Sequence, residues 1–177
     1  MPKYIFLFVL FSFQALAQSD YTRIRAAVGA EAFGSAPQGQ VLAETLFGYQ
    51  KKSFFGWQAG LGMVSAHNFF SYSLASSLTY SYILNPYRRK VCRPHPGYNS
   101  FESYLEAGLG AFYVDAFDSY PGDPYKQRLL TPLALAGLRF HLISERWVYI
   151  VKVRYTPALL ENKLSSVAGV ALALGWK

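Results

Sequence analysis

Residues 165–177 read SSVAGVALALGWK, and two kinds of side chain alternate along them. A strand of a water-soluble sheet usually alternates apolar with polar residues, because one of its faces meets water. Here the second face carries small residues instead. One parity holds Ala168, Val170, Leu172, Leu174 and Trp176, and the other holds Gly169, Ala171, Ala173 and Gly175. The pattern predicts a β-strand with an apolar face on one side and little space on the other.

Seven further segments of about ten residues show the same two-residue alternation and are separated by turn residues. No sustained helical periodicity interrupts them. Eight such segments are the signature of a transmembrane β-barrel, whose sheet must close because every backbone polar group in lipid needs a partner. The sequence therefore predicts an all-β, eight-stranded antiparallel up-and-down transmembrane β-barrel. The other segments are 22–33, 41–50, 55–64, 70–82, 102–114, 130–142 and 147–156.

The charged residues of these segments fall on the parity opposite the apolar one. In a soluble up-and-down barrel the arrangement would be reversed, with the apolar parity inside. Because buried charges persist only when they are paired, we expect these residues to form an ion-pair cluster in a filled lumen, with Phe33, Tyr104 and Phe112 also filling space and His141 beside a Glu. The predicted lumen cluster consists of Arg23, Arg25, Glu31, Glu44, Glu102, Glu106, Arg139, Lys152 and Arg154.

Aromatic residues on the apolar parity gather near one set of strand ends. If both chain termini are periplasmic, these ends lie at the periplasmic interface. Membrane barrels carry aromatic girdles at their interfaces, so we expect one here. Its predicted members are Tyr49, Trp57, Tyr80, Tyr82, Trp147 and Trp176.

The first seventeen residues, MPKYIFLFVLFSFQALA, have the form of a secretory signal peptide. Lys3 supplies the positive start, residues 4–13 the apolar centre, and Ala15-Leu16-Ala17 the small residues of a cleavage site. The stretch is shorter than the roughly 20 residues that a membrane-spanning helix needs. We expect a signal peptide over 1–17 and a barrel domain over 18–177, in preference to a buried amino-terminal strand.

Composition narrows the choice of partners. Aromatic residues make up 18% of the chain, charged residues only 15%, and the formal net charge is +7. For an exported chain this favours anionic membrane lipid or lipopolysaccharide over nucleic acid, for which no aromatic stacking surface is evident. The strongest basic run lies in the connector 86–97, which also holds Cys92, the only cysteine. We interpret it as a solvated turn near lipid headgroups, with docking to a periplasmic partner as the alternative.

At this point the chain resembles the small eight-stranded outer-membrane β-barrel proteins of Gram-negative bacteria. The resemblance rests on the cleavage site ALAQ at 15–18, on the alternating strands, on FESYLEAGLGAFY at 101–113 and TPLALAGLRFHL at 131–142, and on the terminal strand. It implies a place in the outer membrane and recognition of the last strand by the barrel-assembly machinery. In such families that strand usually ends in an aromatic residue, whereas here Lys177 follows Trp176.

We expect a non-enzymatic structural, adhesive or surface-binding role, with no cofactor and no metal. No GxGxxG after a strand, no phosphate-binding loop and no metal-spaced cluster of Cys and His occurs. Two alternatives stay open. One is a lipid A-modifying enzyme of acyltransferase or deacylase type, for which His67, Ser65, Asp118 and Ser119 are the candidate catalytic residues, since a His can activate a Ser hydroxyl. The other is a soluble exported barrel that binds an apolar ligand. The sequence gives no oligomeric state.

Overall fold

The computed structural model describes residues 22–35, 39–66, 69–85, 100–115, 128–160 and 163–177. Over these residues the chain forms eight β-strands. They are β1 (Ala26–Ala32), β2 (Gly39–Phe47), β3 (Ser53–Ala66), β4 (Phe69–Ile83), β5 (Ser100–Asp115), β6 (Arg128–Ile143), β7 (Trp147–Leu160) and β8 (Lys163–Trp176). In this described part of the chain, no helix has the length and apolar character needed to cross a membrane.

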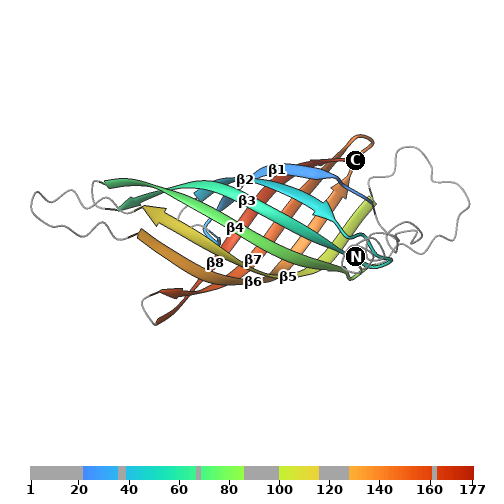
Figure 1. Ribbon diagram of the computed structural model, residues 1–177. Helices are drawn as coiled ribbons and strands as arrows, with labels where there is room; N and C mark the ends of the chain where they lie inside the picture. The colour runs from blue at the N-terminus through green and yellow to red at the C-terminus, as the bar shows by residue number, and fades with distance from the viewer. Residues whose placement is uncertain (1–21, 36–38, 67–68, 86–99, 116–127, 161–162) are drawn as a thin grey trace, which may run out of the picture.

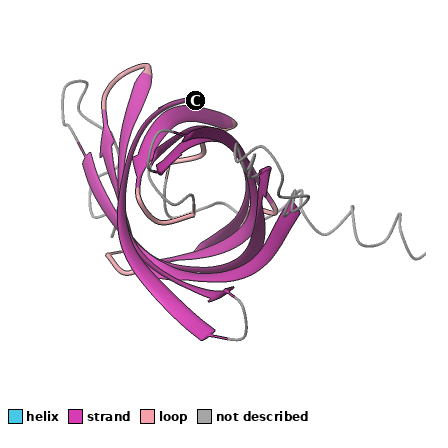
Figure 2. Cartoon of the chain, turned by 90° about the vertical axis from the view of Figure 1, so that its left-hand side faces the viewer, coloured by secondary structure: helices cyan, strands magenta, loops and turns pink. Residues whose placement is uncertain are grey.

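The strands form a closed barrel in which each pairs antiparallel with its neighbours along the chain (Figures 1 and 2). The first and last strands complete the ring, with Ala26 opposite Trp176 and Ala32 opposite Val170. This confirms the predicted eight-stranded antiparallel up-and-down barrel, and every predicted segment contains a strand. The terminal strand, β8, is therefore the element that closes the sheet by pairing with β1.

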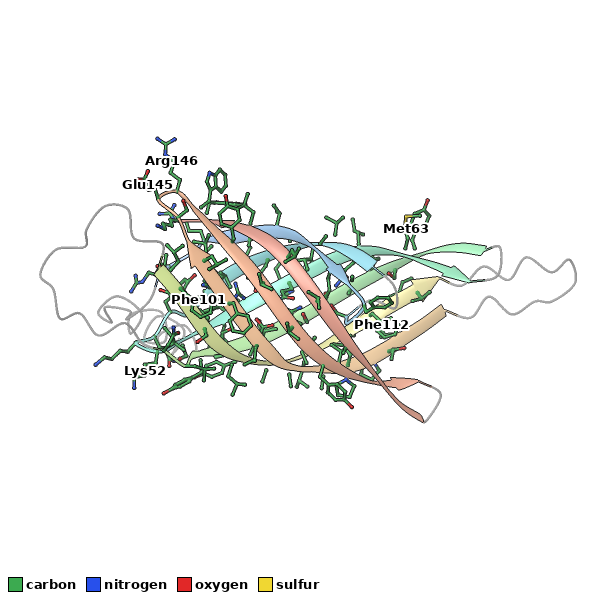
Figure 3. All side chains as sticks on the ribbon, turned by 180° about the vertical axis from the view of Figure 1, so that it is seen from behind. Lys52, Met63, Phe101, Phe112, Glu145 and Arg146 are labelled. Atoms are coloured by element: carbon green, nitrogen blue, oxygen red, sulfur yellow. The ribbon has the colours of Figure 1, made fainter. Side chains whose placement is uncertain are left out.

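The two ends of the barrel differ in their connections. We call one end the base; it holds the β2–β3 turn at 48–52, the β6–β7 turn at 144–146 and the carboxyl terminus at Lys177. Lys52, Glu145 and Arg146 all lie at this end in Figure 3, with Lys52 on the other side of the barrel from Glu145 and Arg146. The opposite end, the rim, holds the far ends of β1, β3, β5 and β7.

The outer face of the barrel is apolar over most strands. Leu109 and Leu130 are 71% and 69% exposed, and Met63 projects outward from the wall in Figure 3. The inward residues of the same strands include buried Glu, Arg and Lys side chains. Because side chains of a strand alternate between its two faces, this distribution follows directly from the two-residue pattern of the sequence.

Two apolar layers fill the interior on either side of these charges. The larger contains Ile24, Leu46, Phe54, Ile83, Tyr104, Ile143, Val148 and Ile150, most of which come from strand ends at the base. The smaller contains Ala75, Phe112, Leu133 and Leu135, farther toward the rim. The interior between them is therefore flanked by apolar side chains rather than open to both ends.

The chain turns inward after β1. Phe33 has a left-handed backbone (φ 59°) and is 54% exposed, so the expectation that it fills the lumen is wrong. Gly34 follows with φ 89°, a conformation that favours glycine, and the next residue, Ser35, is buried. The hydroxyl of Thr156 on β7 donates to the carbonyl oxygen of Gly34 at 2.9 Å, which ties this turn to the strand beyond β8.

Candidate functional site

The centre of the interior is organised around Glu44 on β2. Its Oε1 lies 2.6 Å from Nη1 of Arg139 on β6, and its Oε2 lies 2.8 Å from Nζ of Lys152 on β7. Gln58 on β3 donates its side-chain amide to Glu44 Oε1 at 3.0 Å. Both oxygens of this buried carboxylate therefore accept from cationic groups on the opposite wall.

A second carboxylate, Glu106 on β5, joins two cations. Its Oε1 lies 2.7 Å from Nη2 of Arg154, and its Oε2 lies 3.3 Å from Nη1 of Arg139. Arg154 also donates from Nη1 to Oε1 of Gln58 at 2.9 Å. Arg139 thus bridges the two carboxylates, and five strands are linked through a continuous set of polar contacts.

Toward the rim the network continues to Glu31 on β1. Its Oε2 accepts from the Ser35 hydroxyl and from Nε2 of Gln40, each at 2.5 Å, while its Oε1 lies 3.5 Å from Nη1 of Arg154. Gln40 Nε2 also donates to Ser35 Oγ at 2.7 Å. The inward turn after β1 therefore places its serine directly over the charged interior.

Toward the base the network ends at Glu102 on β5. Its Oε1 accepts from the backbone N–H of Thr22 at 2.8 Å, and its Oε2 accepts from the Tyr104 hydroxyl. Nδ1 of His141 lies 3.6 Å from the same Oε2, as the sequence suggested for a Glu beside this ring. Nε of Arg139 donates to Nε2 of His141 at 2.7 Å, so Nε2 acts as an acceptor and a neutral ring carries its proton on Nδ1.

Seven of the predicted cluster residues are brought together in this way, and Arg23 and Arg25 are not. Both are exposed, whereas Ile24 between them is buried. The next inward residue is Ala27, three positions after Ile24, because the chain bends at Arg25 immediately before β1. This bend shifts the alternation by one residue, as a β-bulge does, so the inward assignment of the two arginines is wrong.

Five of the six predicted girdle residues are exposed on the outer face of strands near the base: Trp57, Tyr80, Tyr82, Trp147 and Trp176. Tyr49 is not among them. The chain leaves β2 through Gly48, which has a left-handed φ of 62°, and Tyr49 then turns toward the apolar layer at the base. Its ring lies 5.6 Å from that of Phe54, and its hydroxyl donates to the Ile24 carbonyl and accepts from the Ile24 N–H. Burial raises the pKa of Tyr49 to about 12.

The structure does not show how the candidate catalytic residues are arranged relative to one another. His67, Asp118 and Ser119 lie outside the described residues, as does the basic connector 86–97 with Cys92. Ser65 lies in β3 at the register position opposite Phe70. Within the described part of the chain, no group of three or more His, Cys, Asp or Glu side chains is arranged to hold a metal ion.

Sequence reasoning did not assign roles to the neutral members of the network. Gln58 and Gln40 share the inward parity of their strands, so the alternation itself was a usable signal for both. Ser35 had no such signal, because it lies beyond the end of β1 and reaches Glu31 only through the inward turn.

These observations define a closed eight-stranded antiparallel barrel with an apolar outer face and a paired, charged interior. Among solved structures, the chain is similar to the crystal structure of the N-terminal β-barrel domain of Pseudomonas aeruginosa OprF, with a TM-score of 0.54 and 15% sequence identity. The match covers 87% of this chain and 100% of that one. At this identity the likeness establishes the fold. No family model matches the chain, and no curated protein matches its sequence.

Proposed function

We propose that this chain is an integral outer-membrane β-barrel protein with a filled interior. The observation that carries the proposal is the distribution of side chains across the wall. Leucine, valine and aromatic residues are exposed on the outside, while Glu44, Arg139 and Lys152 are fully buried inside. A contiguous apolar exterior of this extent is unfavourable in water and is suited to lipid, since monomeric soluble proteins rarely expose large apolar patches.

The interior favours a structural, adhesive or surface-binding role over transport of solutes. Charged groups in the interior are paired with one another at 2.6–3.5 Å, and apolar layers lie on either side of the central ones. Eight strands enclose an interior that side chains can fill. Binding would then take place on the outer face or at the rim, where loops on a rigid wall commonly carry recognition.

The chain would also have to be exported, assembled into the outer membrane and surrounded by lipid there. Export would use residues 1–17 as a cleavable signal, and the barrel-assembly machinery would act on the last strand, which pairs with β1 to close the sheet. The surrounding partners are outer-membrane lipid and lipopolysaccharide. Arg23, Arg25, Lys51 and Lys52 are exposed at the base, where they would meet anionic headgroups.

Fractionation of cells that express the full chain tests the proposal. The protein is expected in the outer membrane and, on gels, to migrate differently before and after boiling, because a folded barrel resists unfolding by detergent. A soluble periplasmic product with no change in migration would contradict it and favour a soluble barrel with an apolar ligand. Mass spectrometry of lipid A from the same cells, from cells expressing His67→Ala and from cells without the protein is expected to give one profile. A difference that depends on His67 would favour the enzyme.

A further inference from the structure

A band of small residues crosses the outer wall of the barrel. The register places Ala43 of β2 opposite Ala59 of β3, Ala59 opposite Ser76 of β4, and Ser76 opposite Ala111 of β5. All four point outward, and together they form the floor of a groove that runs across four neighbouring strands. With strands spaced by about 4.8 Å, this floor is roughly 14 Å long.

A row of large apolar residues borders this floor on the rim side, and one tryptophan borders it on the base side. The row two residues toward the rim contains Val41, Leu61, Leu74, Tyr113 and Leu130, which are also opposite one another in the register. On the base side Trp57 lines the hollow, and Leu78 and Leu109 follow it in the register without lining the hollow themselves. The hollow is open to the outside, has a volume of about 600 Å³, and has an almost wholly apolar lining.

The single hydroxyl of the floor, that of Ser76, accepts a hydrogen bond from a groove-lining tryptophan. Nε1 of Trp57 donates to Oγ of Ser76 at 3.1 Å, a diagonal contact between β3 and β4. In hydrocarbon an unpaired indole N–H would be costly, so this bond leaves the groove suited to an apolar occupant. The bond also holds the indole ring at the edge of the groove, where the ring would contact a bound molecule.

The direction of the groove distinguishes between possible occupants. Its floor lies four residues from the base end of β2 at Ala43, but eleven residues from the base end of β5 at Ala111. The groove therefore climbs obliquely from base to rim, as expected for a row perpendicular to strands that tilt by about 35–45°. A transmembrane helix tilts by about 20° on average and would cross the rim-side row rather than follow the floor.

The width of the groove also argues against a transmembrane helix as its occupant. The rim-side row and Trp57 each lie two residues, or about 7 Å, from the floor row along the strands. Between the rim-side row and Trp57, the side chains narrow the space to less than the roughly 10 Å that a helix with its side chains occupies. A flexible acyl chain is thin enough to enter and can bend to follow the slope. At the rim end Tyr113 offers an amphipathic ring, a residue type enriched at membrane interfaces.

We propose that this groove, floored by Ala43, Ala59, Ser76 and Ala111, binds one acyl chain of a lipid from the leaflet at the rim. The headgroup lies near Tyr113, and the tail runs down the groove past Trp57 toward β2. This inference rests on the proposed membrane location and adds a specific lipid site to it. Lipid would then exchange rapidly over most of the outer wall, whereas the groove would retain one acyl chain.

Quenching of Trp57 by brominated acyl chains tests the site. Trp147→Phe and Trp176→Phe leave Trp57 as the only tryptophan of the protein. The barrel is refolded in detergent, and its folding is checked by heat-dependent migration on gels. Phosphatidylethanolamine with brominated chains is then added from sub-equimolar amounts upward. We expect quenching that saturates near one lipid per barrel. A control in which Trp147 is the only tryptophan is expected to show quenching that rises only with the lipid fraction of the micelle.

Two matched substitutions show whether the groove is responsible. Ala59→Leu fills the floor, while Ala136→Leu makes the same change at an exposed outward position of β6 outside the groove. Ala59→Leu is expected to weaken the saturable quenching at least tenfold, and Ala136→Leu to leave it unchanged. Equal, unsaturable quenching in all variants would overturn the site.

A different occupant is also detectable. If the groove is instead an interface between two copies, the parent barrel is dimeric in light scattering, Ala59→Leu alone makes it monomeric, and quenching does not saturate, which would overturn the proposal. The membrane proposal fails separately, if the refolded barrel does not insert into lipid vesicles at all. A barrel that inserts but shows no saturable quenching contradicts only the lipid site.

Discussion

Nη1 of Arg139 on β6 lies 2.6 Å from Oε1 of Glu44 on β2, across the inside of the barrel. Both side chains are fully buried, so neither has water to replace its partner. The same guanidinium also reaches Glu106 and His141. The ion pair between Arg139 and Glu44 therefore connects two opposite walls of this narrow barrel and helps to set the distance between them.

Replacing Glu44 by Gln is expected to destabilise the barrel strongly. The substitution keeps the shape of the side chain but removes the negative charge between Arg139 and Lys152. Breaking a buried pair by removing one partner costs roughly 3–5 kcal/mol, because an uncompensated charge stays behind. Urea unfolding in lipid vesicles, followed by tryptophan fluorescence, measures the loss. Thr45→Val, on the outward face of the same strand, is the control and is expected to change little.

The double variant Glu44→Gln/Lys152→Met separates pairing from a general packing defect. Removing the partner cation relieves the buried charge, so the double variant is expected to be more stable than the sum of the single losses predicts, by roughly 0.5–3 kcal/mol. Additive losses would contradict the coupling between these two side chains.

Arginine on the outer face is expected to have an effect that depends on depth. Leu138 and Leu142 both point outward from β6, but Leu142 is next to the base turn. If lipid surrounds the wall, Leu138→Arg costs about 2–4 kcal/mol and Leu142→Arg no more than about 1. Unfolding in vesicles measures both. Small, equal effects would indicate that water, rather than hydrocarbon, surrounds this face.

Because Tyr49 is largely buried, we expect the free energy of unfolding to depend on pH in the alkaline range. Burial raises the pKa of Tyr49 from 10.0 to about 12, so the folded barrel holds this proton more tightly than the unfolded chain does. The resulting stabilisation is present in full below about pH 10 and is lost as the pH rises toward 12. Between these values the wild type is expected to lose more stability than Tyr49→Phe. The comparison variant is Tyr82→Phe, on the outer face, which should follow the wild type. A parallel loss in Tyr49→Phe would refute the prediction.

Gly169→Val tests the inward turn after β1. A Cβ atom at Gly169 would lie 2.6 Å from the Cα of Gly34, so the larger side chain must displace backbone. We expect a loss of about 1–3 kcal/mol in urea unfolding, in the range of overpacked interiors. Ala168→Val, at the exposed outward position beside it, is expected to be neutral. Equal stability of the two variants would mean that the turn does not occupy this space.

The residues that the sequence predicted correctly lie inside regular strands. Glu106, Arg139 and Arg154 could be assigned to the interior because alternation is a local rule that depends only on the strand itself. The pairing partners could not be assigned, since Glu44 and Arg139 are 95 residues apart and meet only once the sheet has closed.

The errors lie where strands begin or end. Arg25 lies at a bend, Tyr49 follows a left-handed glycine, and Phe33 itself takes a left-handed backbone. At each position the two-residue alternation stops, but the sequence around it still reads as alternating. The groove on the outer wall is a related case, because four small residues on four strands become a single feature only through the register.

Spin labels on the outward residues of β7 report whether lipid surrounds this wall of the barrel. Single cysteines are placed at Tyr149, Val151, Val153 and Tyr155 in a Cys92→Ser chain, labelled, and refolded into lipid vesicles. We expect oxygen, which concentrates in hydrocarbon, to relax the labels efficiently. We expect a water-soluble nickel complex to reach the labels poorly, with the poorest access at positions farther from the base. Ready access of the nickel complex at all four positions would contradict the contact of this wall with lipid.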